Sequence, residues 1–434
     1  MLPPCAKDAL AEFPPTMTDQ TSNPAAAPGT SRATVAFIFV TLVLDVVGFG
    51  IIIPVLPKLV ESFMAGDTAR AAEMYGLMGT AWALMQFLFS PVLGALSDRY
   101  GRRSVLLLSC FGLGLDYILM ALAPNIMWLF IGRVISGITA ASFSTAGAYI
   151  ADVTPPEKRA AAFGMMGAAF GLGFVLGPAL GGVLGGIDPR LPFWVAAVMT
   201  LLSAFYGFFV LPESLPRERR AGFSWKRANP VGSLTLLRSH HELFGLAGTL
   251  FLMNLAHVVL PSTAVLYMGY RFGWDATTIG LTLAWVGVCA MIVQGGLTKP
   301  AVRRFGERRV LIGGLLFGAA GFTIYALAPT GLWFWVGVAV MSLCGLSGPA
   351  VQGLMTRHVQ PSEQGQLQGA NASLMGIAGL VGPGIFTETF AIFIRPGSLW
   401  HLPGAPFLLA TLLILAAMLL AWRVTRAAIA SGIS

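Results

Sequence analysis

The sequence has 434 residues, of which 56% are hydrophobic and 11% are charged, and its mean hydropathy is +0.76. A soluble protein carries roughly twice that share of charged residues, so the composition excludes a soluble globular protein. The net charge of +8 would favour nucleic-acid binding in a soluble domain. The distribution of basic residues explains it through membrane topology instead, and we expect no nucleic-acid partner.

Residues 1–32 are rich in Ala, Pro, Ser and Thr and contain no apolar core segment. This composition predicts a disordered cytoplasmic tail rather than a signal peptide or a packed element. Met17 opens a shorter tail, so Met1 and Met17 are both candidate translation starts.

Twelve apolar runs follow Arg32, each close to the length that a helix needs to cross a hydrocarbon core of roughly 30 Å. They predict an all-α polytopic membrane protein with twelve transmembrane helices. The runs lie near residues 33–54, 74–96, 104–123, 126–151, 161–185, 191–211, 243–268, 276–298, 309–328, 331–353, 366–390 and 405–422.

The runs form two groups of six, residues 33–211 and 243–424, with a linker at 212–242 and a cytoplasmic tail at 425–434. The linker is basic. It is interpreted either as a tether that rests on the anionic inner leaflet of the bilayer or as an ordinary solvated loop. Its basic residues are Arg217, Arg219, Arg220, Lys226, Arg227 and Arg238.

Lysine and arginine are distributed unevenly between the two sides of the predicted membrane. The two tails and the even-numbered loops hold 21 of these residues, the alternate loops hold 5, and Arg133 lies inside a span. The positive-inside rule therefore places both termini in the cytoplasm, and with them the loop that contains Asp98.

The chain repeats itself at a constant offset of 205 residues. Residues 121–124, Ala-Leu-Ala-Pro, return at 326–329, and Gly177-Pro178 returns as Gly382-Pro383. Two six-helix halves in parallel orientation place a binding site between them near the midplane, with access that alternates by rocking.

The first half holds the unusual membrane charges. Asp45 lies midway along the first run, Asp116 in the third and Arg133 in the fourth, while the repeat replaces Asp116 with Gly321 and Arg133 with Val338. A charge at this depth costs on the order of 3 kcal/mol, so these residues are functional candidates. A carboxylate in a low-dielectric cavity favours its protonated form, which makes Asp45 and Asp116 candidate proton carriers. Arg133 keeps its proton, so its candidate roles are counter-charge or substrate contact.

Further polar residues lie in other runs. His257 is a third proton-coupling candidate because its intrinsic pKa suits proton exchange, although a hydrogen-bonded packing role is equally consistent. The neighbouring Asn254 and three glutamines, Gln86, Gln294 and Gln352, are candidates for lining the substrate pathway or for tying helices together.

The fifth run contains a helix-packing pattern. Gly173, Gly177 and Gly181 recur every four residues, with Pro178 and Gly182 beside them. Small residues at this spacing let another helix approach closely, and the proline allows a bend.

At these residues the sequence resembles the major facilitator superfamily, and within it the drug–proton antiporters of the tetracycline-exporter type. The resemblance covers the chain from about residue 33. The matching segments are the signature loop with Gly94, Asp98, Arg99, Gly101, Arg102 and Arg103, residues 44–48 and 54–57 of the first run, Gly132-Arg133 and Ser136-Gly137, residues 171–182, 271–274, and 349–353.

The resemblance implies export of a small amphipathic, tetracycline-like drug across the inner membrane in exchange for protons. The expected working unit is a monomer in the lipid bilayer, with protons as coupling ion and no cofactor or metal. Exporters of this type carry a histidine in the eighth helix, where this chain has residues 288–291, and an aspartate in the ninth, where it has residues 316–320. Neither titratable group is present, and His257 is a candidate substitute on a different helix.

The resemblance also implies a gate. In the outward-open state Asp98 is expected to cap the amides of the eleventh helix near residues 364–366 and to pair with basic residues of its loop and with Arg159. Asp152 is placed to complete that network.

Other functions are less consistent with the sequence. Transport of an endogenous metabolite in either direction is the nearest alternative. An enzyme is not expected, because no Gly-x-Ser-x-Gly, His-Glu-x-x-His or phosphate-loop motif occurs. A sensor is not expected either, because the sequence predicts no sizeable soluble domain.

Overall fold

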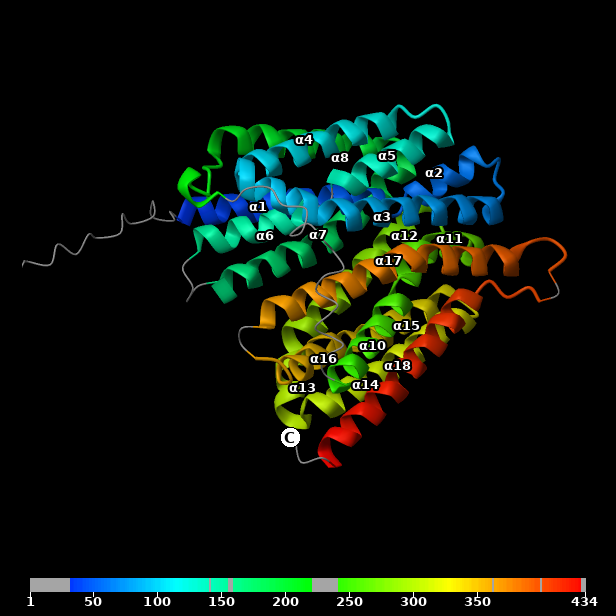
Figure 1. Cartoon of the computed structure of the whole chain (residues 1–434). Coiled ribbons are helices and arrows are strands. Elements are labelled where there is room, and N and C mark those ends of the chain that lie inside the picture. Colours follow the sequence, from blue (N-terminus) through cyan, green and yellow to red (C-terminus); the bar gives the residue numbers. More distant parts are fainter. Residues whose placement is uncertain are drawn as a thin grey trace, which may run out of the picture.

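The computed structural model describes residues 32–139, 142–154, 159–220, 241–360, 363–398 and 400–430. Regular structure in these ranges is helical throughout (Figure 1). The first bundle consists of α1 (Arg32–Ile52), α2 (Leu56–Phe63), α3 (Thr68–Tyr100), α4 (Arg102–Ala121), α5 (Ile126–Thr139), α6 (Ser142–Val153), α7 (Arg159–Ile187) and α8 (Leu191–Val210), followed by the short η2 (Arg217–Arg219). The second consists of α10 (His241–His257), α11 (Val259–Phe272), α12 (Ala276–Met291), η4 (Ile292–Leu297), α13 (Thr298–Phe305), α14 (Glu307–Leu327), α15 (Gly331–Ser342), η5 (Leu343–Leu346), α16 (Ser347–Thr356), α17 (Gln364–Ile394) and α18 (Ala405–Ala430).

The prediction of an all-α membrane protein with twelve spans is confirmed. Eleven continuous helical stretches of the described chain are long and apolar enough to cross a membrane. The fourth span is made of two shorter helices, α5 and α6, with residues 140–141 between them outside the described ranges. Most of the predicted linker and of the first tail also lies outside these ranges, so their predicted roles remain predictions.

Several spans contain a change of winding. Proline lies inside α3 as Pro91, inside α7 as Pro178 and inside α17 as Pro383. The eighth span passes through a π-helical turn, η4, and the tenth through a 3₁₀ turn, η5. A π-helical turn frees backbone groups from the regular ladder and is frequent at functional sites.

The internal repeat has a clear structural counterpart at the turn between the second and third spans of each half. Gly101 separates α3 from α4 with φ of 103°, and Gly306 separates α13 from α14 with φ of 78°. These two positions are 205 residues apart. Both need glycine because L-residues with a side chain rarely adopt positive φ.

The two bundles are related in the same way. The fifth span, α7, packs along α12 of the second bundle, and the eleventh span, α17, packs along α3 of the first. In Figure 1 the bundles lie one above the other, converge on the right and diverge on the left.

One end of the molecule is closed between the bundles. We call it the Glu73 end, after Glu73 in the first turns of α3. There Arg395 forms an ion pair with Glu73, and the Lys58 ammonium donates a hydrogen bond to the Trp274 carbonyl at 2.8 Å. The Tyr75 hydroxyl donates to the Pro261 carbonyl at 3.2 Å.

The opposite end, which carries Asp98 near the end of α3, is open. No hydrogen bond or ion pair between described residues joins the two bundles there. A Cβ at Gly94 or Gly164 of the first bundle, or at Gly295 or Gly348 of the second, would meet no described atom within 4 Å outside the neighbouring backbone of its own helix. We call this the Asp98 end.

Candidate functional site

A cavity of about 2380 Å³ lies between the bundles and extends from Tyr75 to Gly94 along α3. Most of its wall is aromatic and aliphatic. Six of the polar residues predicted from sequence line it: Asp45, Gln86, Arg133, Asn254, His257 and Gln294. Apolar walls with a few polar groups are typical of a small-molecule binding site.

Asp45 is the acidic residue of this lining. It lies on α1, and the Cys110 thiol of α4 is 3.6 Å from its Oδ2. Its Oδ1 is buried and has no hydrogen-bond partner among the described residues. A carboxylate that faces a cavity with one oxygen unpartnered is able to take up and release a proton there.

Asp116 occupies a different environment, between α4 and α5. It is 2% exposed, does not line the cavity, and neither of its carboxylate oxygens has a partner among the described residues. A Cβ at Gly132 of α5 would lie 3.0 Å from Asp116 Oδ1. The structure therefore separates the two aspartates, because only Asp45 is in contact with the cavity.

Arg133 lies one residue after Gly132 and reaches the cavity wall. Its guanidinium carbon is 5.5 Å from the centre of the Trp82 ring, a cation–π arrangement. It forms no ion pair with Asp45, Asp116 or any other residue in the described part of the chain. The counter-charge role is thus not realised in this conformation.

The second bundle contributes neutral polar groups. The Nδ1 of His257 donates a hydrogen bond of 2.7 Å to the Met253 carbonyl, and the ring has a second hydrogen bond with the Cys344 side chain. Gln294 lies in the π-helical turn η4, and Gly345 of η5 lies beside it, with a Cβ position 3.7 Å from Gln294 Cγ. Asn254 is one turn before His257 on α10.

Gln352 is placed elsewhere. It does not line the cavity, and its side-chain oxygen accepts a hydrogen bond of 2.8 Å from the Asn371 amide of α17. This contact ties α16 to α17, which is the helix-tying role that the sequence left open.

The glycine pattern of α7 faces two neighbours. A Cβ at Gly173 would meet Val46 at 2.5 Å, and one at Gly181 would meet the Ile51 carbonyl at 1.9 Å, so α1 packs directly on this face. Gly182 faces the other bundle, with Gly280 of α12 2.8 Å from its Cβ position. Gly177 and Pro178 lie between these contacts. A larger side chain on the face toward α1 would separate α7 from α1, and one on the face toward α12 would separate α7 from α12.

A charged cluster surrounds the start of α4 at the Asp98 end. Arg102 forms ion pairs with Asp98 at 2.5 Å and with Asp152 at 3.2 Å. Glu213, just after α8, accepts a hydrogen bond of 2.9 Å from the Arg102 amide. Ser214 donates to Asp152 at 3.3 Å.

The remaining gate candidates lie around this cluster. Arg103 donates to the Phe208 carbonyl, Arg99 lies over the Tyr100 ring, and Gly101 forms the turn. The Arg159 side chain lies outside the described residues. Among the described residues no side chain caps the first turn of α17. The predicted contact with Asp98 is therefore absent from this conformation, in which the bundles are apart at that end.

Two features of the site were missed from the sequence. Glu213 falls in the predicted linker, where no sequence pattern indicates its contact with Arg102, and no pattern indicates the Glu73–Arg395 ion pair. The basic member of that pair, Arg395, is one of only five basic residues in the alternate loops. A basic residue in loops where few occur is the sequence signal that could have indicated a specific contact. At the same end Asp275 caps α12, and hydrogen bonds from the Thr278 hydroxyl and amide hold the pKa of Asp275 below its usual value.

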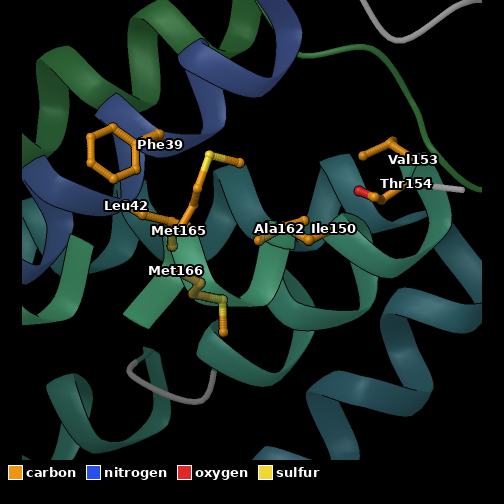
Figure 2. A pocket seen from close by; sticks show the side chains of 8 residues that line it. All are labelled: Phe39, Leu42, Ile150, Val153, Thr154, Ala162, Met165 and Met166. Carbon is orange, nitrogen blue, oxygen red and sulfur yellow. The ribbon is translucent and has the colours of Figure 1, made fainter. Parts of the chain in front are cut away.

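A second, small pocket of about 20 Å³ lies among α1, α6 and α7 (Figure 2). Its wall is made of aliphatic, aromatic and thioether side chains with one hydroxyl, from Thr154. It is large enough for about one water molecule and offers no charge to a ligand.

Two repeated helical bundles with one central cavity, open at one end and closed at the other, define the class of secondary membrane transporters. The comparisons with known proteins give the family. The family model described as Major Facilitator Superfamily matches residues 38–383 and, in an overlapping match, residues 264–432. The chain belongs to the major facilitator superfamily.

Relatives in this family include bacterial tetracycline resistance proteins. The class C protein of Escherichia coli is 40% identical over 364 residues, which cover 83% of this chain and 90% of that protein. The class B protein of Escherichia coli is 33% identical over 387 residues, covering 88% and 94%. Among solved structures, the human organic anion transporter MFSD10 (TETRAN) has a TM-score of 0.66 at 25% identity, covering 90% of this chain and 99% of that one. The predicted family resemblance is confirmed.

Proposed function

We propose that this chain exports a tetracycline-like amphipathic drug across the bacterial inner membrane in exchange for protons, by alternating access. The observation that carries the proposal is the carboxylate of Asp45 in the wall of the large, mostly apolar cavity between two repeated bundles. The similarity to tetracycline resistance proteins over more than four fifths of the chain supports the drug class.

The charge distribution supports the orientation. The Asp98 end carries most of the basic residues and is cytoplasmic in this proposal, as are both termini. The open Asp98 end makes the described conformation inward-open, and the contacts at the Glu73 end exclude the periplasm.

The proposed cycle depends on competition at Asp45. In the inward-open state a drug enters the cavity from the cytoplasm and favours the deprotonated carboxylate, so that the proton leaves to the cytoplasm. The loaded bundles rock, the Glu73 end opens and the drug dissociates outside. A proton from the periplasm then neutralises Asp45 and favours the return to the inward-open state.

Asp116 has a secondary role in this proposal. Its oxygens are screened from the cavity by the packing of α4 on α5, so a proton reaches Asp116 only when these helices move. His257 lies on the opposite wall of the cavity and is assigned a contact with the drug.

Closure of the Asp98 end is assigned to the charged cluster. In the outward-open state Asp98 leaves Arg102 and caps the amides at the start of α17, as expected from the family resemblance. Exposed or half-exposed pairs of this kind contribute about 1 kcal/mol or less each, which suits a contact that forms and breaks in every cycle.

The proposal also covers partners. The working unit is a monomer in the lipid bilayer, with protons as coupling ion and without cofactor, metal, nucleic acid or enzymatic activity.

Drug susceptibility and proton exchange test the function together. Cells that express the chain are compared with cells that express Asp45→Asn for growth in tetracycline and in a panel of amphipathic drugs. Everted membrane vesicles from the same cells then report proton release when each protective drug is added. We expect protection and proton release with the unaltered chain and neither with Asp45→Asn.

The result that overturns the proposal is a well-inserted chain that neither protects cells nor exchanges protons for any drug of the panel. Proton exchange with a metabolite instead would establish the alternative, a transporter without a role in drug resistance.

A further inference from the structure

A cysteine lies beside the aspartate that carries the proton in the proposed function. Cys110 of α4 lines the central cavity together with Asp45 of α1 and is 8% exposed. Its Sγ is 3.6 Å from Asp45 Oδ2, which is a hydrogen-bonding distance for sulfur. The other oxygen of the carboxylate, Oδ1, is buried and has no hydrogen-bond partner among the described residues. The thiol therefore contacts one oxygen of Asp45 and leaves the other free.

The chemistry of a thiol suits both protonation states of its neighbour. A thiol is a weak hydrogen-bond donor and a weak acceptor. When Asp45 is ionised, the Cys110 S–H donates to Oδ2 and favours the charged form. Because the donor is weak, it holds the carboxylate in that form less firmly than a hydroxyl or a cation would. A weak donor is thus compatible with a carboxylate that loses and regains a proton in every cycle.

The other titratable groups near Asp45 come from two helices. Asp116 and Tyr117 lie on α4, and Arg133 lies on α5. The Tyr117 hydroxyl is within electrostatic range of all three charged residues. The helices α7 and α8 also pack against α1, but the described part of α7 presents no titratable side chain and α8 has a single, exposed tyrosine. Among the described residues, Cys110 is the group that forms a hydrogen bond with Asp45.

The internal repeat shows that the fold does not need a polar pair at these two positions. The residues 205 positions after Asp45 and Cys110 are Leu250 and Leu315. They lie on α10 and α14, and both are buried. Apolar packing is therefore sufficient at the corresponding positions of the second bundle. The thiol beside the carboxylate is a feature of the first bundle, which contributes the acidic residue to the cavity wall.

We propose that Cys110 is a positioning residue for proton exchange at Asp45. Its thiol holds Oδ2 by a hydrogen bond and leaves Oδ1 to take up and release the proton. The proposal rests on the proposed function, in which Asp45 carries the proton, and adds a residue to it. Two consequences can be measured: the pH range of proton release depends on the thiol, and the reactivity of the thiol depends on the charge of Asp45.

The first test is the pH dependence of proton release from everted vesicles when tetracycline is added. Cys110→Ala and Cys110→Leu both remove the donor, and the leucine also fills the space, as Leu315 does in the second bundle. The ionised carboxylate then loses a hydrogen bond, so both variants are expected to release the proton at a higher pH. We expect the midpoint to move upward by about half a pH unit. Cys110→Ser retains a donor and should show less than half of that displacement.

A second cysteine provides the matched control. Cys289 of α12 is also a buried thiol, but it does not line the cavity. Cys289→Ala should therefore leave the midpoint unchanged. A residue that only fills space would alter the amount of inserted protein or the maximal rate, whereas a displaced midpoint reports a change in proton binding.

The second test needs no drug. Iodoacetamide, a small neutral alkylating agent, is added to the purified full chain, and its reaction with Cys110 is followed by mass spectrometry. The thiolate is the reactive form, and an ionised carboxylate in hydrogen-bond contact opposes its formation. Asp45→Asn removes that charge, so Cys110 is expected to react about ten-fold faster than in the unaltered chain. Cys289 should react at the same rate in both.

Each test has a result that overturns the proposal. One is the midpoint of the unaltered chain in both Cys110→Ala and Cys110→Leu, and the other is an equal rate of Cys110 alkylation with and without the Asp45 charge. If the unaltered chain releases no proton with tetracycline or any other drug of the panel, the proposed function is wrong, and with it the role of Cys110 in proton release. Faster alkylation in Asp45→Asn would still establish the contact between the two side chains, so the two failures are distinguishable.

Discussion

At the Asp98 end each bundle has an ion pair at corresponding positions, but the acidic and the basic partner are exchanged between the two bundles. In the first, Arg102 at the start of α4 pairs with Asp152 of α6 at 3.2 Å. At the positions 205 residues later, Glu307 at the start of α14 pairs with Arg357, just after α16, at 3.1 Å. The comparison teaches that this fold needs an ion pair between these two elements, whereas the sign of each partner is free to differ.

A third pair of corresponding residues also differs in the sign of its charge. Asp98 joins Arg102 and Asp152 in the first bundle, and the corresponding residue of the second bundle is Arg303. One set of three therefore carries a net charge of −1 and the other +1. In the proposed cycle these sets approach each other with complementary charge when the Asp98 end closes, which would add attraction to the proposed contact of Asp98 with α17.

Deeper in the bundles the difference concerns packing. Asp116 is accommodated beside Gly132, whereas its counterpart Gly321 lets α14 approach α15 so closely that a Cβ there would lie 2.7 Å from the Met341 Cα. The counterpart of Arg133, Val338, is 1% exposed. The second bundle has close helix contact where the first has buried charge, and the proposed function accordingly assigns the main proton carrier to the first bundle.

The largest expected effect comes from Asp45, the acidic residue that only the first bundle contributes to the cavity wall. Asp45→Asn should reduce proton-coupled efflux to the level of cells without the chain, because the amide neither binds nor releases a proton. His257→Gln should retain proton coupling and change mainly the apparent affinity. Vesicle proton release and drug uptake check both, and loss of coupling in His257→Gln with retention in Asp45→Asn would reverse the comparison.

A smaller effect is expected at the Asp98 end. Asp98→Ala should slow turnover by about five-fold, since an interaction of about 1 kcal/mol shifts a conformational equilibrium by that factor. Asp98→Glu should keep much of the activity because the charge remains. Glu218→Ala is the control, an acid at the same end outside the set of three. Equal loss in both Asp98 variants would indicate a steric role instead of an electrostatic one.

Charge reversal within one bundle tests the opening comparison directly. Arg102→Glu should lower thermal stability by about 2 °C or more, because it places three acids together and removes the two ion pairs of Arg102, each worth about 1 kcal/mol or less. Adding Asp152→Arg should restore most of the stability, as Glu307 and Arg357 already form this reversed pair. Melting curves of the purified variants check this, and a double variant no more stable than the single one would mean that the sign is fixed by the fold.

The smallest expected effect lies at the Glu73 end. Glu73→Gln removes the ion pair with Arg395 and should shift the population toward the outward-open state by about five-fold or less. Distances between spin labels on α3 and α17 report the shift. Asp67→Asn is the control, because the ion pair of Asp67 with Arg70 stays within one bundle. No change beyond that of the control would show that helix packing alone closes this end.

Sequence patterns predict the architecture well. The length of each apolar run, the number of basic residues in each loop and the constant 205-residue offset can all be read without knowing how the helices pack. They predict less about the site, because the face that a polar residue presents depends on how neighbouring helices pack. Asp45 and Asp116 look equivalent as intramembrane acids, yet only Asp45 lines the cavity. Gln352 and Gln294 look equivalent as amides, yet one bonds to Asn371 and the other lies in the cavity wall.

Long-range ionic contacts are the other limit. The pairing of Glu73 with Arg395 joins residues 322 positions apart, and no periodicity connects them. The position of Glu213 at the start of α4 likewise depends on how the chain leaves α8. By contrast, the reversed pair of Glu307 and Arg357 is readable from the 205-residue offset once both partners are compared.

The size of the central cavity has a consequence for the energetics of each cycle. At about 30 Å³ per molecule, a space of about 2380 Å³ holds on the order of 80 waters when it is open at the Asp98 end, which is the cytoplasmic end in the proposed orientation. Closing the Asp98 end expels many of them, so the conformational step includes osmotic work. Solutes too large to enter the cavity should therefore favour the closed arrangement, and the rate of efflux becomes sensitive to the water activity of the cytoplasm.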